Sequence, residues 1–188
     1  MRLWRLTRAI HLDAPLSGLG AKKHGARWNS KGQAVVYMSE SLELALLEAL
    51  VHLDPDLVPK DMHQVCIELD DSLVVPLTEA LPDGWDRPPP YRASVQEIGD
   101  RWLRDRSSLA LAVPASVLPG RRNVLLNPTH KDFGAVRQVS TEPLPWPSRL
   151  ISYVEQIRRP VGDKRTKRNE RTNVDIRGRP TRSHKTPL

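Results

Sequence analysis

The apolar residues of this chain fall mostly into short runs of strand length, and only two segments have the spacing of a helix. The runs are rich in β-branched and aromatic residues and are bounded by turn residues. No internal repeat connects them. This mixture of short strands and few helices is typical of an α+β fold with small mixed or antiparallel sheets and packed helices. We predict strands at residues 2–6, 34–38, 65–69, 73–77, 109–113 and 123–126.

The two predicted helices cover residues 40–53 and 93–105, and we expect the second to pack on the sheet. Ser39 is placed to cap the first helix. The proline-rich segment 82–92 is predicted to be a loop. The dipeptide Pro119-Gly120 marks a tight turn, so the strands on either side of it are expected to be antiparallel neighbours.

Charge divides the chain into two parts, residues 1–154 and 155–188. The second part holds 11 of the 29 Lys and Arg residues but only four of the 22 Asp and Glu residues, so the first part is formally neutral. The basic part has almost no large apolar side chains and is predicted to be a disordered tail. Two interpretations stay open for it: a nonspecific anchor for nucleic acid, and a solvated extension with no selected role.

Several function classes find little support. No segment approaches the roughly 20 apolar residues that cross a bilayer, so we expect a cytoplasmic protein without membrane contact. The single cysteine, Cys66, is interpreted as a small core residue. The histidines form no close metal-ligand pair with it, and we expect no metal. The segment 18–20 lacks the third glycine of a Rossmann fingerprint and lies in a predicted loop.

One acidic residue is out of place on the first predicted helix. Glu48 has Leu44 and Ala45 one turn before it and Val51 and His52 one turn after it, so its side chain emerges from a mostly apolar stripe. It is either a residue at the edge of the stripe whose carboxylate reaches water, or a catalytic carboxylate.

The order of short motifs along the chain resembles the RES domain family, which is named for an arginine, a glutamate and a serine. The resemblance covers about residues 2–150. The motifs, in order, are Trp4-Arg5, Gly25-Ala26-Arg27-Trp28-Asn29, Tyr37-Met38-Ser39, Ala45-Leu46-Leu47-Glu48-Ala49-Leu50, Val113-Pro114-Ala115-Ser116 and Asn123-Val124-Leu125-Leu126-Asn127-Pro128.

The resemblance implies a fold like that of ADP-ribosyltransferase toxins, with residues 1–154 as the RES domain. It implies a toxin of a type II toxin–antitoxin system that degrades NAD+, which is the substrate, and no further cofactor is expected. The family arginine corresponds to Arg27 and the family glutamate to Glu48. The serine position holds Ala115, and the neighbouring Ser116 replaces it only if the backbone shifts by one residue, because adjacent strand residues face opposite sides.

On this resemblance, Glu48 and Arg27 are the expected catalytic residues. The bidentate guanidinium of Arg27 suits the pyrophosphate of NAD+, and Arg5 is expected to assist it. Tyr37 offers an aromatic face to the nicotinamide ring. Ser39 and Ser116 complete the expected NAD+ site. Cleavage of the nicotinamide–ribose bond develops positive charge on the ribose, which a carboxylate stabilises.

The residues do not distinguish among water, phosphate and a protein side chain as the acceptor. Two alternatives remain: a nucleic-acid-binding or ribonuclease-type toxin that uses the basic tail, and a weakened family member that only binds its antitoxin. The resemblance also implies partners. We expect a cognate antitoxin with an Xre-like helix-turn-helix, contact with DNA only through that antitoxin, and a homodimer within the complex.

Overall fold

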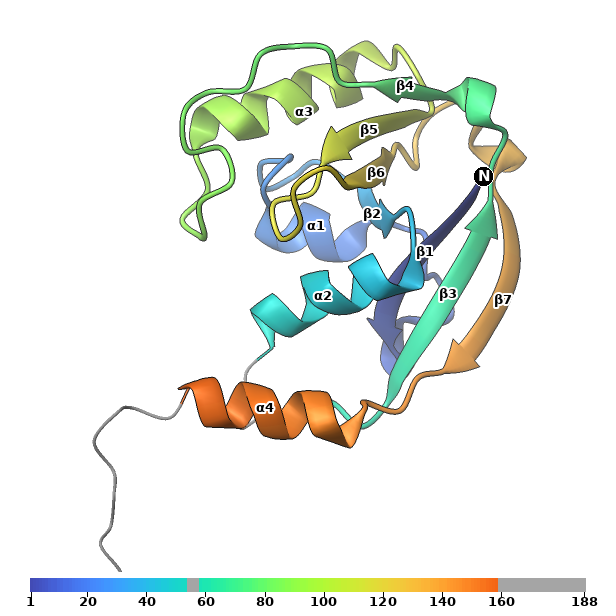
Figure 1. Cartoon of the computed structure of the whole chain (residues 1–188). Coiled ribbons are helices and arrows are strands. Elements are labelled where there is room, and N and C mark those ends of the chain that lie inside the picture. Colours follow the sequence, from blue (N-terminus) through green and yellow to red (C-terminus); the bar gives the residue numbers. More distant parts are fainter. Residues whose placement is uncertain (54–57, 159–188) are drawn as a thin grey trace, which may run out of the picture.

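The computed structural model describes residues 1–53 and 58–158, and its strands form a single mixed sheet of seven (Figure 1). The strand order is β4-β5-β6-β2-β1-β3-β7, and all neighbours are antiparallel except β4 and β5. The predicted α+β class is confirmed, with one sheet in place of several. The strands are β1 (Arg2–Arg8), β2 (Val36–Ser39), β3 (Met62–Glu68), β4 (Val74–Pro76), β5 (Ala110–Pro114), β6 (Arg122–Leu126) and β7 (Arg137–Pro143).

The sheet is weakly joined at its centre. β1 pairs with β3 along its whole length, from Arg2 to Arg8, whereas it pairs with β2 only where Trp4 lies opposite Ser39. The sheet therefore consists of two well-paired groups, β4-β5-β6-β2 and β1-β3-β7, that diverge from this contact (Figure 1). Side chains of β1 and β2 that lie beyond the contact are free to line a cavity.

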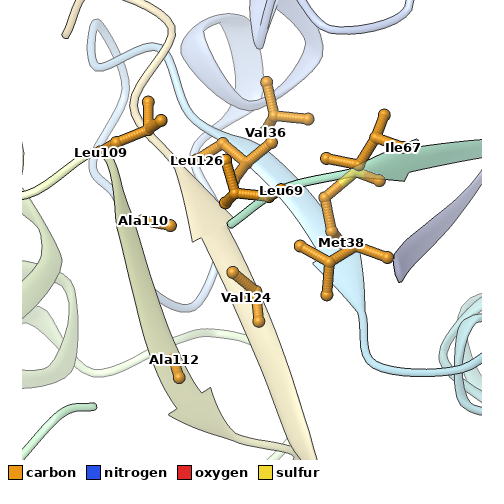
Figure 2. Packing of buried hydrophobic residues seen from close by; sticks show 10 residues of the cluster. Val36, Met38, Ile67, Leu69, Leu109, Ala110, Ala112, Val124 and Leu126 are labelled. Atoms are coloured by element: carbon orange, nitrogen blue, oxygen red, sulfur yellow. The ribbon is translucent and has the colours of Figure 1, made fainter. Parts of the chain in front are cut away.

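Both faces of the first group are buried, because side chains alternate along its strands. Ala110 and Ala112 of β5 belong to one apolar cluster, which Figure 2 shows from close by, and Leu111 and Val113 belong to another. α3 (Ala93–Asp105) covers the second cluster with Val95, Ile98, Trp102 and Leu103. The prediction that this helix packs on the sheet is confirmed, and so is the burial of Cys66 in the core.

The first helix begins later than predicted. α2 (Leu42–His52) is capped by Ser41, whose hydroxyl accepts a hydrogen bond from the backbone N–H of Leu44 at 3.2 Å. The prediction of Ser39 as the cap is wrong because β2 continues to Ser39, and the chain needs two further residues to turn into the helix. The six predicted strands, the turn at Pro119-Gly120 and the loop at 82–92 are confirmed.

In the described part of the chain, two α-helices and one strand were not predicted. Segment 18–20 is not a loop: Gly18, in the left-handed region with φ 67°, caps α1 (Leu19–His24). The edge strand β7 is mostly exposed and so lacks a long apolar run. α4 (Ser148–Arg158) crosses the predicted boundary between residues 154 and 155, so the first residues of the predicted tail are helical. Residues 159–188 of that tail lie outside the described part of the chain.

Candidate active site

A cavity of about 360 Å³ opens where β1 and β2 diverge. This volume falls within the range of ligand pockets, about 300–1,000 Å³. All six residues that the sequence singled out lie in its wall: Arg5, Arg27, Tyr37, Ser39, Glu48 and Ser116. The rest of the lining is Trp4, Leu6, Ala26, Trp28, Met38, Ala45, Ala49, His52, Tyr91, Pro114 and Asn123.

Glu48 lines this cavity from α2, together with Ala45, Ala49 and His52 of the same helix. Its Oε1 atom accepts a hydrogen bond of 2.6 Å from Nδ2 of Asn123. The Oδ1 atom of Asn123 accepts in turn from the hydroxyl of Ser39 at 2.8 Å. Glu48 is therefore the end of a chain of hydrogen bonds that begins in β2.

Arg27 lies on a segment that α3 holds against the sheet. The side-chain amide of Gln96 donates to the carbonyl oxygens of Ala26, at 2.9 Å, and Asn29, at 3.2 Å. Gly99 of α3 packs so closely on Trp28 that a side chain at position 99 would overlap the Trp28 carbonyl oxygen. The position of the Arg27 backbone is therefore fixed by the packing of a helix.

The guanidinium of Arg27 is already bound to the proline-rich loop. Nη1 donates to the carbonyl oxygens of Trp85 and Arg87, the latter at 2.9 Å. The guanidinium carbon lies 5.0 Å from the ring centroid of Tyr91 and 5.9 Å from that of Trp85, which are cation–π distances. Arg27 thus anchors the loop beside the cavity and leaves its other N–H groups for a ligand.

Arg5 brings a second guanidinium to the cavity. Nη1 donates to the carbonyl oxygen of Pro15 at 2.7 Å, and the buried Nε finds no hydrogen-bond partner among the described residues. Burial lowers the pKa of Arg5 from its ordinary value, yet an arginine remains charged at neutral pH. A buried cation with an unsatisfied donor favours an anionic ligand nearby.

Tyr37 is held by its hydroxyl, which donates to Oδ1 of Asn29 at 2.8 Å and accepts from the backbone N–H of Trp28 at 3.0 Å. Burial raises the pKa of the phenol well above its ordinary value. Asn29 is fully buried and donates to the carbonyl oxygens of Ala21, Ser30 and Gln33. Tyr37 therefore stays neutral and presents its ring to the cavity.

The structure places Ser116, not Ala115, in the cavity wall. β5 ends at Pro114, so the strict alternation of the strand no longer applies to the two residues that follow it. Ala115 is buried and its backbone N–H donates to the carbonyl oxygen of Arg121 at 2.9 Å. A hydroxyl is thus present at this edge of the cavity, one residue later than in the family pattern.

Eleven lining residues were not proposed as site residues from the sequence, and three of them contribute an imidazole, a phenol or an amide: His52, Tyr91 and Asn123. His52 lies one turn after Glu48 on α2, and this spacing was a usable signal. Asn123 begins the last of the family motifs, but its contact with Glu48 depends on the pairing of β2 with β6. Tyr91 comes from the proline-rich loop, whose path no pattern in the sequence predicts.

The cavity combines two guanidinium groups, one carboxylate and aromatic rings, which suits a ligand that has both anionic and cationic parts. Among residues 1–53 and 58–158, no three His, Cys, Asp or Glu side chains are grouped to hold a metal ion. In the same part of the chain, no helix is long and apolar enough to span a bilayer.

The fold and this cavity define an α+β protein whose cavity is lined by two arginines and a single acidic residue, Glu48. The chain belongs to the RES domain family, whose model matches residues 2–147. It is 39% identical over 134 residues to a protein of Yersinia enterocolitica named "Toxin Res", covering 71% of this chain and 88% of the relative. It is 38% identical over 140 residues to the "Prs ADP-ribosylating toxin" of a Sphingobium species, covering 71% and 86%.

The fold also resembles a solved structure, that of the M. tuberculosis MbcT-MbcA toxin-antitoxin complex. The TM-score is 0.60 with 20% identity, and the match covers 84% of this chain and 88% of the other. At this identity the likeness bears on the fold alone. It agrees with the assignment to the family.

Proposed function

We propose that this chain is the toxin of a bacterial toxin–antitoxin pair and that it cleaves the nicotinamide–ribose bond of NAD+ in the cavity. One observation carries the proposal: the carboxylate of Glu48 lies in the same cavity as the guanidinium groups of Arg5 and Arg27. NAD+ has an anionic pyrophosphate and a cationic nicotinamide ribose, so both kinds of group have a counterpart. The names of the relatives, toxins and an ADP-ribosylating toxin, support the same class.

Arg5 and Arg27 bind the pyrophosphate in this proposal. A guanidinium holds two phosphate oxygens through parallel N–H groups, which orients the dinucleotide as well as attracting it. Tyr37 and Tyr91 are two of the aromatic residues in the wall, and in this proposal the adenine or the nicotinamide packs against them.

Glu48 acts on the ribose. Departure of nicotinamide leaves an oxocarbenium-like ribose, and the negative charge of a carboxylate stabilises that transition state more than the ground state. The leaving group is a pyridinium and departs neutral, so no general acid is needed. The electron pair of the broken C–N bond goes to nicotinamide, and the acceptor supplies the electrons of the new bond to ribose.

An enzyme that removes NAD+ from its own cell has to be restrained, and we propose a cognate antitoxin that covers the cavity. The solved complex of a similarly folded toxin with its antitoxin supports this partner. We expect the antitoxin to carry an Xre-like helix-turn-helix, contact with DNA through the antitoxin alone, a dimer of toxins in the complex, and a cytoplasmic location.

The test is to replace Glu48 by glutamine, which keeps size and hydrogen bonding but removes the charge. We expect NAD+ binding, measured by calorimetry, to persist while the rate of NAD+ loss falls by about 100-fold or more. Glu43→Gln is the matched control, because Glu43 is exposed in the first turn of the same helix and lies outside the cavity. A Glu48→Gln protein that consumes NAD+ at the wild-type rate refutes the proposal.

A further inference from the structure

Asn123 is the residue that connects Glu48 to the sheet. It lies near the start of β6, directly opposite Ser39 of β2 in the antiparallel register. Its amide bridges the two: the oxygen accepts from the Ser39 hydroxyl at 2.8 Å, and the nitrogen donates to Glu48 at 2.6 Å. The position of the Glu48 carboxylate thus depends on two strands as well as on its own helix.

The chemistry of the three groups allows only one arrangement. An ionised carboxylate accepts hydrogen bonds and cannot donate, so Asn123 has to turn its NH2 group toward Glu48. Its carbonyl oxygen then faces Ser39, and the hydroxyl of Ser39 has to donate its single proton there. Ser39 is only 5% exposed, so water has little access to that proton. The carboxylate of Glu48 therefore sets which way the amide points, and the Ser39 hydroxyl completes the contact at the amide oxygen.

The Glu48 side chain has small neighbours on its own helix. Ala45 and Ala49, which also line the cavity, leave it room to rotate, and His52 follows one turn later. A glutamate has three rotatable bonds, and a carboxylate at the edge of a helix gains hydration by turning to water. The short bond from Asn123 opposes that rotation and keeps the charge inside the cavity.

We propose that Asn123 is a positioning residue, which Ser39 holds through a hydrogen bond and which aims the carboxylate of Glu48 at the reacting ribose. The proposal rests on the function proposed above for Glu48. It gives Ser39 a role different from the one expected from the sequence: its hydroxyl proton is donated to Asn123 and is not available to NAD+. Removal of the Asn123 amide is then expected to affect turnover more than binding.

Kinetics provide the first test. We expect Asn123→Ala to lower kcat by about 10-fold to 100-fold, with KM for NAD+ changed little, because a misplaced catalytic group affects the transition state first. In a Glu48→Gln background the same substitution is expected to lower kcat no further. If the alanine variant folds poorly, Asn123→Asp takes its place. This substitution keeps the volume of the side chain but places a second carboxylate next to that of Glu48. Multiplicative effects of Asn123→Ala and Glu48→Gln on kcat overturn the proposal.

A spectroscopic test does not depend on the substrate. The side-chain N–H resonances of Asn123 are identified by their absence in Asn123→Asp. We expect them to shift when Glu48→Gln removes the charged acceptor, to shift again in Ser39→Ala, and to stay in place in Glu43→Gln. If Glu48→Gln leaves these resonances unmoved, the proposal is wrong. If they move but wild-type protein consumes no NAD+, the positioning contact stands and the proposed reaction fails.

Discussion

The bond between Arg27 and the proline-rich loop leads to a prediction that differs from the one for a simple phosphate ligand. Arg27→Ala removes the donor to the carbonyl oxygens of Trp85 and Arg87 and the cation–π contact with Tyr91. A hydrogen bond to a charged group contributes roughly 1.5–3 kcal/mol, and an exposed cation–π contact about 0.5–1 kcal/mol. Because the two carbonyls lie near the surface and can turn to water, we expect a net loss of about 2 kcal/mol.

For a protein of this size, about 2 kcal/mol lowers Tm by roughly 4–8 °C. The matched control is Arg87→Ala, because Arg87 is exposed and contributes its carbonyl oxygen, which the substitution retains. Thermal unfolding and limited chymotrypsin digestion in the loop, which contains Trp85 and Tyr91, measure the two effects. We expect Arg27→Ala to melt earlier and to be cut faster in the loop, and Arg87→Ala to match the wild type.

An Arg27→Ala protein with wild-type Tm and wild-type loop cleavage refutes this reasoning. If the reasoning holds, the same variant loses NAD+ affinity for two reasons at once. It lacks a phosphate ligand, and the wall of the cavity near Tyr91 is no longer fixed. We therefore expect Arg27→Ala to lose more NAD+ affinity than the removal of one charged contact would cause.

Two further predictions concern the support of the site. Gly99→Ala is expected to lower the free energy of unfolding in urea by about 1–3 kcal/mol, because its Cβ would lie 2.9 Å from the carbonyl carbon of Trp28. The control is Gly20→Ala in α1, whose Cβ would meet open space, so this substitution is expected to be neutral or stabilising. Equal effects of the two substitutions contradict the close contact. The raised pKa of Tyr37 means that the unfolded chain loses this proton above about pH 10 while the folded chain keeps it, so stability falls as pH rises beyond that value. Tyr37→Phe is expected to make that decline shallower, and an unchanged pH profile speaks against a buried phenol.

The sequence predicts what depends on local pattern. The apolar runs of β5 and β6 and the helical spacing of α3 follow from contacts with the two apolar clusters, so they were predictable. The edge strand β7 was not, because its exposed residues carry no apolar signal and its pairing with β3 alone makes it a strand.

In the candidate site, too, the local sequence pattern was predictive and the long-range contacts were not. Family motifs identified Arg27 and Glu48, and the structure brings both to one cavity. The register of β2 with β6 that joins Asn123 to Glu48 is a long-range property, as is the path that carries Tyr91 to the guanidinium of Arg27. Neither the strand register nor the path of the loop can be predicted from the spacing of residues along the chain.

The acceptors that hold the loop to Arg27 are main-chain oxygens, which every amino acid possesses. Substitution at position 87 leaves the main-chain carbonyl oxygen in place. The side chain there can therefore change during evolution while the hydrogen bond from Arg27 to the loop persists. A comparison of residue identities among related sequences would show such a position as variable and would give no sign of the hydrogen bond. The same freedom makes the segment a suitable place for loop exchange: side chains beside the cavity mouth can be redesigned, provided that the course of the backbone past Arg27 is kept.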